Sequence, residues 1–174
     1  MSNKKHQEKG FTLAELMIAI FVFTVGILGA YGVIQQSAQF IKHASNHLTA
    51  AYLAQEGVEM IKNIRDTNFL EKHLGYDSSN LWDEGFETDG CYEIDWNMLF
   101  NEVDPNILSC ASRYLKIDTN GTYNYSNGET TNFQREIWIS SDGPDSKMIR
   151  VKVKWQEGSK NYEFETIEKI YNWL

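Results

Sequence analysis

The 174-residue sequence predicts an α+β fold, in which one long N-terminal helix packs on a C-terminal antiparallel sheet. Three observations predict it. Residues 11–34 form an almost uncharged apolar run, apolar residues recur at helical spacing over residues 50–64, and strand-like runs alternate with turn residues after residue 113. A hydrophobic content of 42% with 13% aromatic residues excludes a disordered chain.

The first element is the apolar run FTLAELMIAIFVFTVGILGAYGVI, residues 11–34, whose one charged side chain is Glu15. As a helix it is about 36 Å long, which is enough to cross a hydrocarbon core of about 30 Å. A cleaved secretory signal has an apolar region of only about 7–15 residues, so the run predicts a transmembrane helix instead. The lysines before it, Lys4, Lys5 and Lys9, favour a cytoplasmic N-terminus, with the rest of the chain outside.

The second element continues the same helix to Ile64 or Arg65 as an amphipathic segment, because the predicted apolar stripe keeps helical spacing. Glu56, Glu59, Lys62 and Asp66 are expected on the other side, with a possible ion pair between Lys62 and Asp66. The stripe comprises Ala50, Leu53, Ala54, Gly57, Val58, Ile61 and Ile64.

The remaining elements are expected in residues 67–174. Residues 66–111 are predicted to be an irregular connection with one short strand near residues 91–98. Strands are predicted at 113–118, 122–125, 131–139, 148–155 and 162–167, with tight turns at Asn120-Gly121, at residues 126–128 and at residues 157–160. In the third of these strands, alternation places Phe133, Arg135, Ile137 and Ile139 on one face.

Charge is distributed unevenly along the chain. By side-chain count the net charge is +2 in residues 1–10, -1 in residues 11–34 and -9 in residues 35–174, which gives -8 for the whole chain. An acidic exterior argues against nucleic-acid binding, because attraction to phosphates depends on Lys and Arg. One local basic patch could still form from Arg113, Lys116, Lys147, Arg150, Lys152 and Lys154.

Residues 9–16, Lys-Gly-Phe-Thr-Leu-Ala-Glu-Leu, closely resemble the leader junction of type IV prepilins and type II secretion pseudopilins. In that family a short basic leader ends in Gly, the next residue is usually Phe or Met, and Glu follows at the fifth position after the cut. The counterparts here are Gly10, Phe11 and Glu15. The resemblance implies a pilin-like fold, cleavage by a prepilin peptidase between Gly10 and Phe11, and methylation of the new amine of Phe11.

Glu15 has two interpretations. A carboxylate at the centre of a membrane helix costs about 2.5–3.5 kcal/mol, so it needs either water or a partner. In the first interpretation Glu15 lies near the cytoplasmic end and reaches the interface. The resemblance implies the second, in which Glu15 meets the N-terminal amine of an adjacent filament subunit, since the two charges offset part of each other's desolvation.

A second resemblance covers residues 50–69, AAYLAQEGVEMIKNIRDTNF, which look like the post-membrane helix of minor pilins and minor pseudopilins. It favours a minor over a major subunit. The expected organisation is a cleaved leader (1–10), a transmembrane or filament-core half of the helix (11–34), an amphipathic half (35–66), and a head with a variable loop and sheet (67–174).

Two cysteines and three aspartates are the other candidate site residues. Cys91 and Cys110 lie in the segment predicted to be outside the cytoplasm, which favours a disulfide over two free thiols. Asp118, Asp142 and Asp145 resemble fragments of calcium loops, and some pseudopilins bind calcium. They lack the regular ligand spacing, so they are interpreted as ordinary turns, and no metal or cofactor is predicted.

No catalytic motif accompanies these features, so an enzyme is not predicted. The predicted function is a structural subunit, a minor pilin or pseudopilin, of a type IV pilus-like filament. The expected partners are the prepilin peptidase, other pilin subunits, and the platform protein and ATPase of assembly. The expected location is the inner membrane before assembly and an extracellular or periplasmic filament afterwards. Secretion, adhesion, motility and DNA uptake stay open as roles. The alternative is a non-polymerising, membrane-anchored domain that binds a ligand or an adhesive surface.

Overall fold

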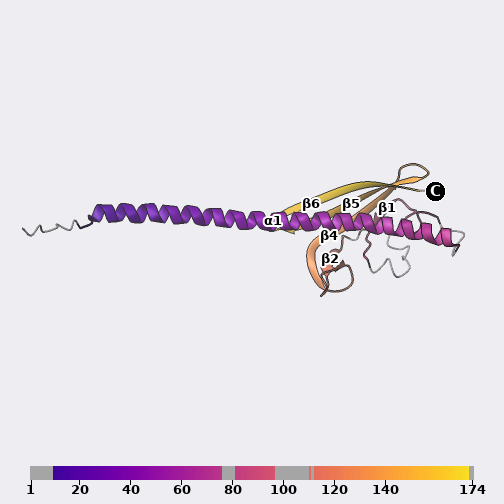
Figure 1. The fold of residues 1–174 in the computed structure, drawn as a ribbon, viewed down its shortest axis with the longest axis horizontal. Helices are drawn as coiled ribbons and strands as arrows, with labels where there is room; N and C mark the ends of the chain where they lie inside the picture. Colours follow the sequence, from indigo (N-terminus) through magenta and orange to yellow (C-terminus); the bar gives the residue numbers. More distant parts are fainter. Residues whose placement is uncertain (1–9, 76–80, 97–109, 111, 173–174) are drawn as a thin grey trace, which may run out of the picture. The chain divides into compact units, whose positions relative to one another are not determined.

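The computed structural model describes residues 10–75, 81–96, 110 and 112–172. The helix α1 precedes an antiparallel sheet (Figure 1). The strand order is β3-β2-β4-β5-β6, and β1 also pairs with β4. The α+β fold predicted from the sequence is therefore confirmed. The elements are α1 (Leu13–Leu74), β1 (Gly90–Tyr92), β2 (Tyr114–Ile117), β3 (Tyr123–Asn124), β4 (Glu129–Ser141), β5 (Ser146–Glu157) and β6 (Lys160–Tyr171).

The chain divides into two compact units, residues 1–44 and residues 45–174. In the first unit, every described residue from Gly10 to Lys42 is exposed, on all sides of the helix. An 18-residue window of α1 has a mean hydropathy of 2.3 and no buried residue, so length and composition allow it to cross a membrane. An apolar helix that buries nothing within its own chain needs lipid or another apolar surface around it.

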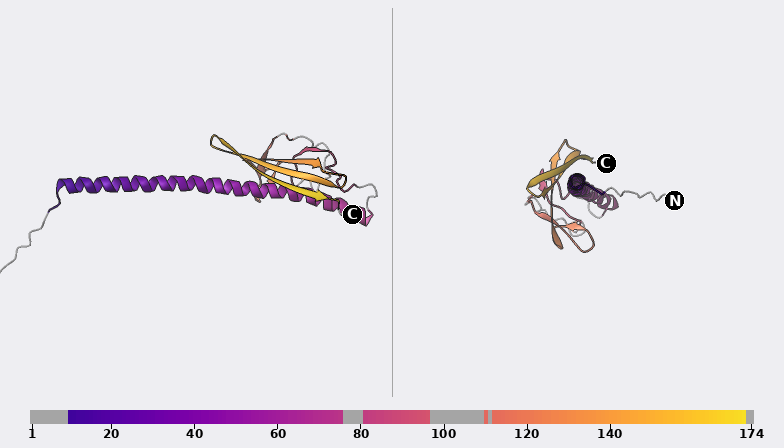
Figure 2. Two further views of the ribbon diagram at one scale, coloured as in Figure 1. Left: turned by 90° about the horizontal axis from the view of Figure 1, so that it is seen from above. Right: turned by 90° about the vertical axis from the view of Figure 1, so that its left-hand side faces the viewer.

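In the second unit, residues 45–74 of α1 pack on one face of the sheet. Figure 2 shows strands running alongside this magenta part of the helix. The predicted stripe is buried along its whole length, from Ala50 to Ile64. It meets a sheet face on which β4 contributes Phe133, Ile137 and Ile139, as the alternation in the sequence predicted. From β5 come Ile149, Val151, Val153 and Trp155.

Gly57 lets the helix approach the sheet closely. A Cβ atom at this position would lie 2.9 Å from Val151 Cγ1 and 3.3 Å from Arg135 Cδ. The first distance is shorter than real Cβ contacts allow. The absence of a side chain at Gly57 is therefore what permits β5 to pack directly against the helix backbone.

A buried arginine joins the helix to the sheet. Arg135 is 0% exposed, and its guanidinium lies 3.3 Å from Glu56 Oε2. It also donates hydrogen bonds to the backbone carbonyls of Ile94, at 2.8 Å, and Leu53, at 3.2 Å. The prediction that Glu56 lies on the side away from the sheet was wrong, because the ion pair with Arg135 draws it to the edge of the core.

Tyr125 belongs to the same buried cluster. Its hydroxyl donates to the carbonyl of Arg135 at 3.0 Å, and its backbone N–H donates to Asp95 Oδ2 at 2.8 Å. Burial raises the pKa of the Tyr125 hydroxyl to about 12. The cluster therefore holds the segment around Ile94 between the helix and the turn that follows β3.

The helix is longer than predicted, because residues 66–74 are helical and not part of the connection. Nothing in that stretch breaks a helix, since Pro and Gly are absent until Gly75. Gly75 has a positive φ of 73°, and its N–H donates to the carbonyl of Lys72 at 3.3 Å. Lys72 and His73 in the last turn complement the negative end of the helix dipole.

Lys62 does not pair with Asp66. It lies 3.3 Å from Glu168 on β6 and 3.9 Å from Glu59, while Asp66 pairs with Arg65 at 2.7 Å. Lys62 therefore pairs with a carboxylate of the sheet, that of Glu168, and not with the predicted partner on its own helix.

The strands follow the predicted order with different lengths. β4, β5 and β6 are longer than predicted, and β1 is shorter; residues 97 and 98 of that predicted strand lie outside the described residues. The predicted turn at Asn120-Gly121 joins β2 to β3, with Gly121 at a φ of 84°. At Gly128, φ is 112° and a Cβ atom would overlap the backbone of Ile117, so only glycine fits there.

Candidate functional site at the N-terminus

The residues predicted to be processed lie just before α1. Gly10, Phe11 and Thr12 are non-helical and exposed, and the helix begins at Leu13. The rest of the predicted leader, including Lys4, Lys5 and Lys9, lies outside the described residues. The bond between Gly10 and Phe11 is therefore two residues ahead of the first helical residue.

Thr12 caps the helix. Its side-chain oxygen accepts a hydrogen bond from the N–H of Glu15 at 3.3 Å, and its carbonyl accepts from the N–H of Leu16 at 3.2 Å. This is the N-cap arrangement, in which a hydroxyl satisfies a backbone donor that the first turn leaves unpaired. The cap was not predicted, although Thr12-Leu13-Ala14-Glu15 has the S/T-x-x-E spacing of a capping box.

Glu15 lies in the first turn of α1, where a negative charge interacts favourably with the positive end of the helix dipole. Within the described part of the chain its carboxylate has no ion-pair or hydrogen-bond partner. The helix around it is exposed on all sides. The carboxylate of Glu15 thus lies near Phe11, the residue that the predicted cleavage would place at the N-terminus, and its oxygens are available as acceptors.

In the second unit, Cys91 and Cys110 form a disulfide, with their Cα atoms 5.4 Å apart. Two further contacts fasten the chain that follows each cysteine. The carboxylate of Glu93, which is 1% exposed, accepts from the side chain of Arg113 at 2.6 Å and from its backbone N–H at 3.0 Å. The disulfide and this ion pair together tie the start of β2 to the segment after β1.

The three aspartates considered for calcium have protein partners. Asp118 Oδ1 accepts from the N–H groups of Asn120 and Thr122, at 2.8 and 2.9 Å, which is the hydrogen bonding of a turn. Asp142 Oδ2 lies 2.6 Å from the Lys169 ammonium. The carboxylate of Asp145 accepts a hydrogen bond from the side-chain nitrogen of Asn172 at 3.3 Å, and the backbone carbonyl of Asp145 accepts from the backbone N–H of Asn172 at 2.9 Å. Among the described residues, no group of three or more His, Cys, Asp or Glu is placed to hold a metal ion.

The six residues of the predicted basic patch do not leave a positive surface. Lys147 is buried beside Asp83, 3.2 Å away. Lys154 is 2.6 Å from Glu136. The others are Arg113 with Glu93, Arg150 with Glu165, Lys152 with Glu163 and Glu165, and Lys116 with the carbonyl of Ser126. A carboxylate therefore faces every cation of the set except Lys116.

One electrostatic effect on the surface of this unit comes from β4. Hydrogen bonds from the hydroxyl and N–H of Ser141 to Asp89 hold the pKa of that carboxyl below its usual value. The stronger acid stays ionised at lower pH, so this contact between the connection and the end of β4 persists as the solution becomes acidic.

Comparison with family models finds the prokaryotic N-terminal methylation motif at residues 5–31, which include Gly10, Phe11, Thr12 and Glu15. Comparison with curated proteins and with solved structures returns no significant match. The motif covers the end of the predicted leader and most of the apolar run 11–34, and the fold behind it is a long helix packed on an antiparallel sheet. The chain therefore carries the type IV prepilin-like signal, and signal and fold together are consistent with the type IV pilin and pseudopilin family.

Proposed function

We propose that the protein is a structural subunit, a minor pilin or pseudopilin, of a type IV pilus-like filament. The observation that carries the proposal is the methylation motif on a helix whose first half buries nothing within its own chain. Such a helix suits two successive environments, the lipid of the inner membrane and the packed helices of a filament. No catalytic constellation was recognised in the sequence, and signal and fold suggest a structural subunit rather than an enzyme.

In this proposal, residues 1–10 are removed on the cytoplasmic side by a prepilin peptidase, and the new amine of Phe11 is methylated. Residues 11–34 form the transmembrane and filament-core half of the helix. The amphipathic half of the helix, residues 35–66, and the head, residues 67–174, are outside the cytoplasm, a location that suits the disulfide between Cys91 and Cys110. The platform protein and the assembly ATPase then move the subunit into a filament with other pilins.

The processing step is tested by co-expression with an active prepilin peptidase and intact-mass analysis. We expect a loss equal to the mass of residues 1–10, offset by the small gain that results when a methyl group replaces one hydrogen of the new amine. Substitution Gly10→Val removes the small residue before the cut and should abolish the loss. An intact N-terminus in the presence of a peptidase that cleaves a control prepilin would overturn the proposal.

The role of Glu15 in assembly needs two variants, because Glu15 also sits in a capped first turn. Glu15→Gln keeps the helix and removes the charge, whereas Thr12→Ala removes the cap and keeps the charge. If Glu15 meets a subunit amine, Glu15→Gln is cleaved normally but recovered in sheared filaments at a small fraction of the normal amount. Thr12→Ala should assemble far better than Glu15→Gln. Equal incorporation of Glu15→Gln and the unchanged protein would remove the assembly role.

A further inference from the structure

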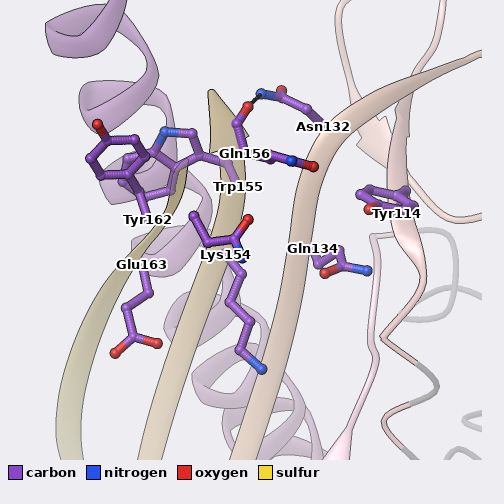
Figure 3. A pocket seen from close by; sticks show the side chains of 9 residues that line it. Tyr114, Asn132, Gln134, Lys154, Trp155, Gln156, Tyr162 and Glu163 are labelled. Atoms are coloured by element: carbon purple, nitrogen blue, oxygen red, sulfur yellow. Dashed lines mark hydrogen bonds between the residues drawn. The ribbon is translucent and has the colours of Figure 1, made fainter. Parts of the chain in front are cut away.

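A hollow lies on the face of the sheet that points away from α1, across β2, β4, β5 and β6. Its volume is about 400 Å³, within the range of small-molecule sites. Figure 3 shows Gln134, Lys154 and Gln156 between Tyr114 on one side and Glu163 and Tyr162 on the other. Asn132 and Asn161 complete the outward part of the lining, whereas Trp155 and its stacked register partner Tyr162 contribute from the side packed against α1.

Strand register places the outward side chains of this hollow in two rows. Tyr114 is opposite Gln134, Gln134 is opposite Lys154, and Lys154 is opposite Glu163. In the second row Gln156 is opposite Asn161, and the side chain of Asn132 bonds to the backbone of Gln156. Four neighbouring strands span about 14 Å, and residues two apart along a strand are about 7 Å apart. The hollow is thus elongated across the strands.

Hydrogen bonds hold the side-chain amides in this hollow in fixed orientations. The side-chain nitrogen of Asn132 donates to the carbonyl of Gln156 at 3.1 Å, and that of Gln156 donates to the carbonyl of Gly158 at 3.0 Å. The side-chain nitrogen of Gln134 donates to the carbonyl of Ser112. A carbonyl only accepts, so each amide must present its nitrogen to the backbone and its oxygen elsewhere.

These three amide oxygens accept no hydrogen bond from the described part of the chain. They are therefore acceptors of fixed direction, grouped in one hollow, and a ligand rich in hydroxyl donors would satisfy them. Beside them Tyr114 is 49% exposed and offers a flat apolar face. A sugar ring combines hydroxyl edges with an apolar C–H face, and so matches both features.

Charge and position argue against charged ligands and against an added peptide strand. The Lys154 ammonium is 2.6 Å from Glu136, and Glu163 lies 3.8 Å from Lys152, so neither an anion nor a cation finds an unopposed charge here. The hollow reaches the edge strand β6 but opens on the face of the sheet, so a peptide lying in it would meet side chains and the backbone groups of β4 and β5, which are already paired within the sheet. We propose that this hollow binds a short neutral oligosaccharide.

The test uses the full chain, uncleaved, in a detergent without a sugar headgroup. The probes are immobilised short neutral oligosaccharides of glucose, galactose, mannose and N-acetylglucosamine, with heparin and oligogalacturonate as charged comparators. We expect retention on at least one neutral probe, unchanged when the salt concentration is raised. Retention on no neutral probe, or only on charged probes with loss in salt, would overturn the proposal. The uncleaved chain makes this result independent of filament assembly.

Two variants and two matched controls locate the binding. Gln134→Leu and Tyr114→Ala should each weaken the dissociation constant for the retained probe roughly tenfold or more, by titration calorimetry. Trp138→Ala removes a similarly exposed aromatic ring from the same sheet face outside the hollow, and Gln55→Leu removes an exposed amide on α1. Both controls should stay within about twofold of the unchanged protein. Equal weakening in variants and controls, or none in either, would place the sugar elsewhere.

Discussion

At the scale of single residues, Arg135 shows what alternation in a strand can and cannot predict. The pattern correctly placed it on the inward face, but gave no sign of its partner, because Glu56 lies on another element 79 positions earlier. Its Nε atom has no hydrogen-bond partner among the described residues, so the cluster is not fully satisfied. Replacing Arg135 measures how much its ion pair and hydrogen bonds contribute to the free energy of unfolding.

Arg135→Met keeps much of the side-chain volume and removes the charge. The carbonyls of Ile94 and Leu53 then lose their donor inside the core, and we expect the free energy of unfolding to fall by about 3 kcal/mol. For a chain of this size the midpoint of thermal unfolding should fall by about 6–12 °C, measured by near-ultraviolet circular dichroism. Arg150→Met, which breaks an exposed pair with Glu165, should cost under about 1 kcal/mol. Equal shifts of the midpoint for the two variants would contradict the view that Arg135 stabilises the fold more than an exposed ion pair does.

Tyr125 gives the head a measurable response to alkaline pH. Its pKa is about 12 in the folded protein against 10.0 for an unperturbed tyrosine, because burial disfavours the phenolate. The group therefore adds stability that is complete below pH 10 and is lost as the pH rises toward 12. In that window the free energy of unfolding should fall by up to about 1.4 kcal/mol per pH unit through this residue. Denaturant titrations at several pH values should show that the free energy of unfolding falls less steeply with pH in Tyr125→Phe. If it falls equally steeply in the variant, other groups cause the pH dependence.

At the scale of elements, the contact between α1 and β5 depends on one glycine. Gly57→Ala improves helix propensity by about 1 kcal/mol, but its Cβ atom would meet Val151 Cγ1 at 2.9 Å. We expect a net loss of about 1–2 kcal/mol in the free energy of unfolding, because overpacking in a well-packed core outweighs the gain. Denaturant unfolding of the full chain measures it.

A double-mutant cycle separates the two effects. In a Val151→Ala background the crowding atom is gone, so adding Gly57→Ala should be neutral or stabilising. Gly29→Ala is the propensity control, because a Cβ atom added there would have nothing within 4 Å and the residue lies outside the head. If Gly57→Ala costs the same in both backgrounds, the contact with Val151 does not limit the packing.

At the scale of the whole molecule, sequence patterns predicted the order of elements, the buried stripe of α1 and the inward face of β4. These depend on local periodicity, which a single sequence contains. The end of the helix was missed because Gly75, and not the change in composition near residue 66, stops it. The partners of Glu56 and Lys62 were missed because they come from distant strands, where contacts depend on register. The hollow on the outer sheet face has no local signature, since its residues come from four strands.

The disulfide between Cys91 and Cys110 should stabilise the molecule as a whole. Closing a loop with a sequence separation of 19 contributes about 3 kcal/mol in the chain-entropy model. We expect the double variant Cys91→Ser, Cys110→Ser to unfold at a lower temperature, matching the unchanged protein after reduction. Reductant should have no further effect on the double variant, and a reduced protein that melts like the oxidised one would contradict the prediction.

The cap at Thr12 has one further consequence, for the peptidase. Proteolytic enzymes act on chain that they can hold in an extended conformation, and a peptide bond inside a helix is protected from them. Since α1 begins at Leu13, the accessible stretch after the Gly10–Phe11 bond is only Phe11 and Thr12. In the proposed processing step, the start of the helix at Leu13 therefore confines a cut to the residues before it, and the cap at Thr12 helps to hold that start in place.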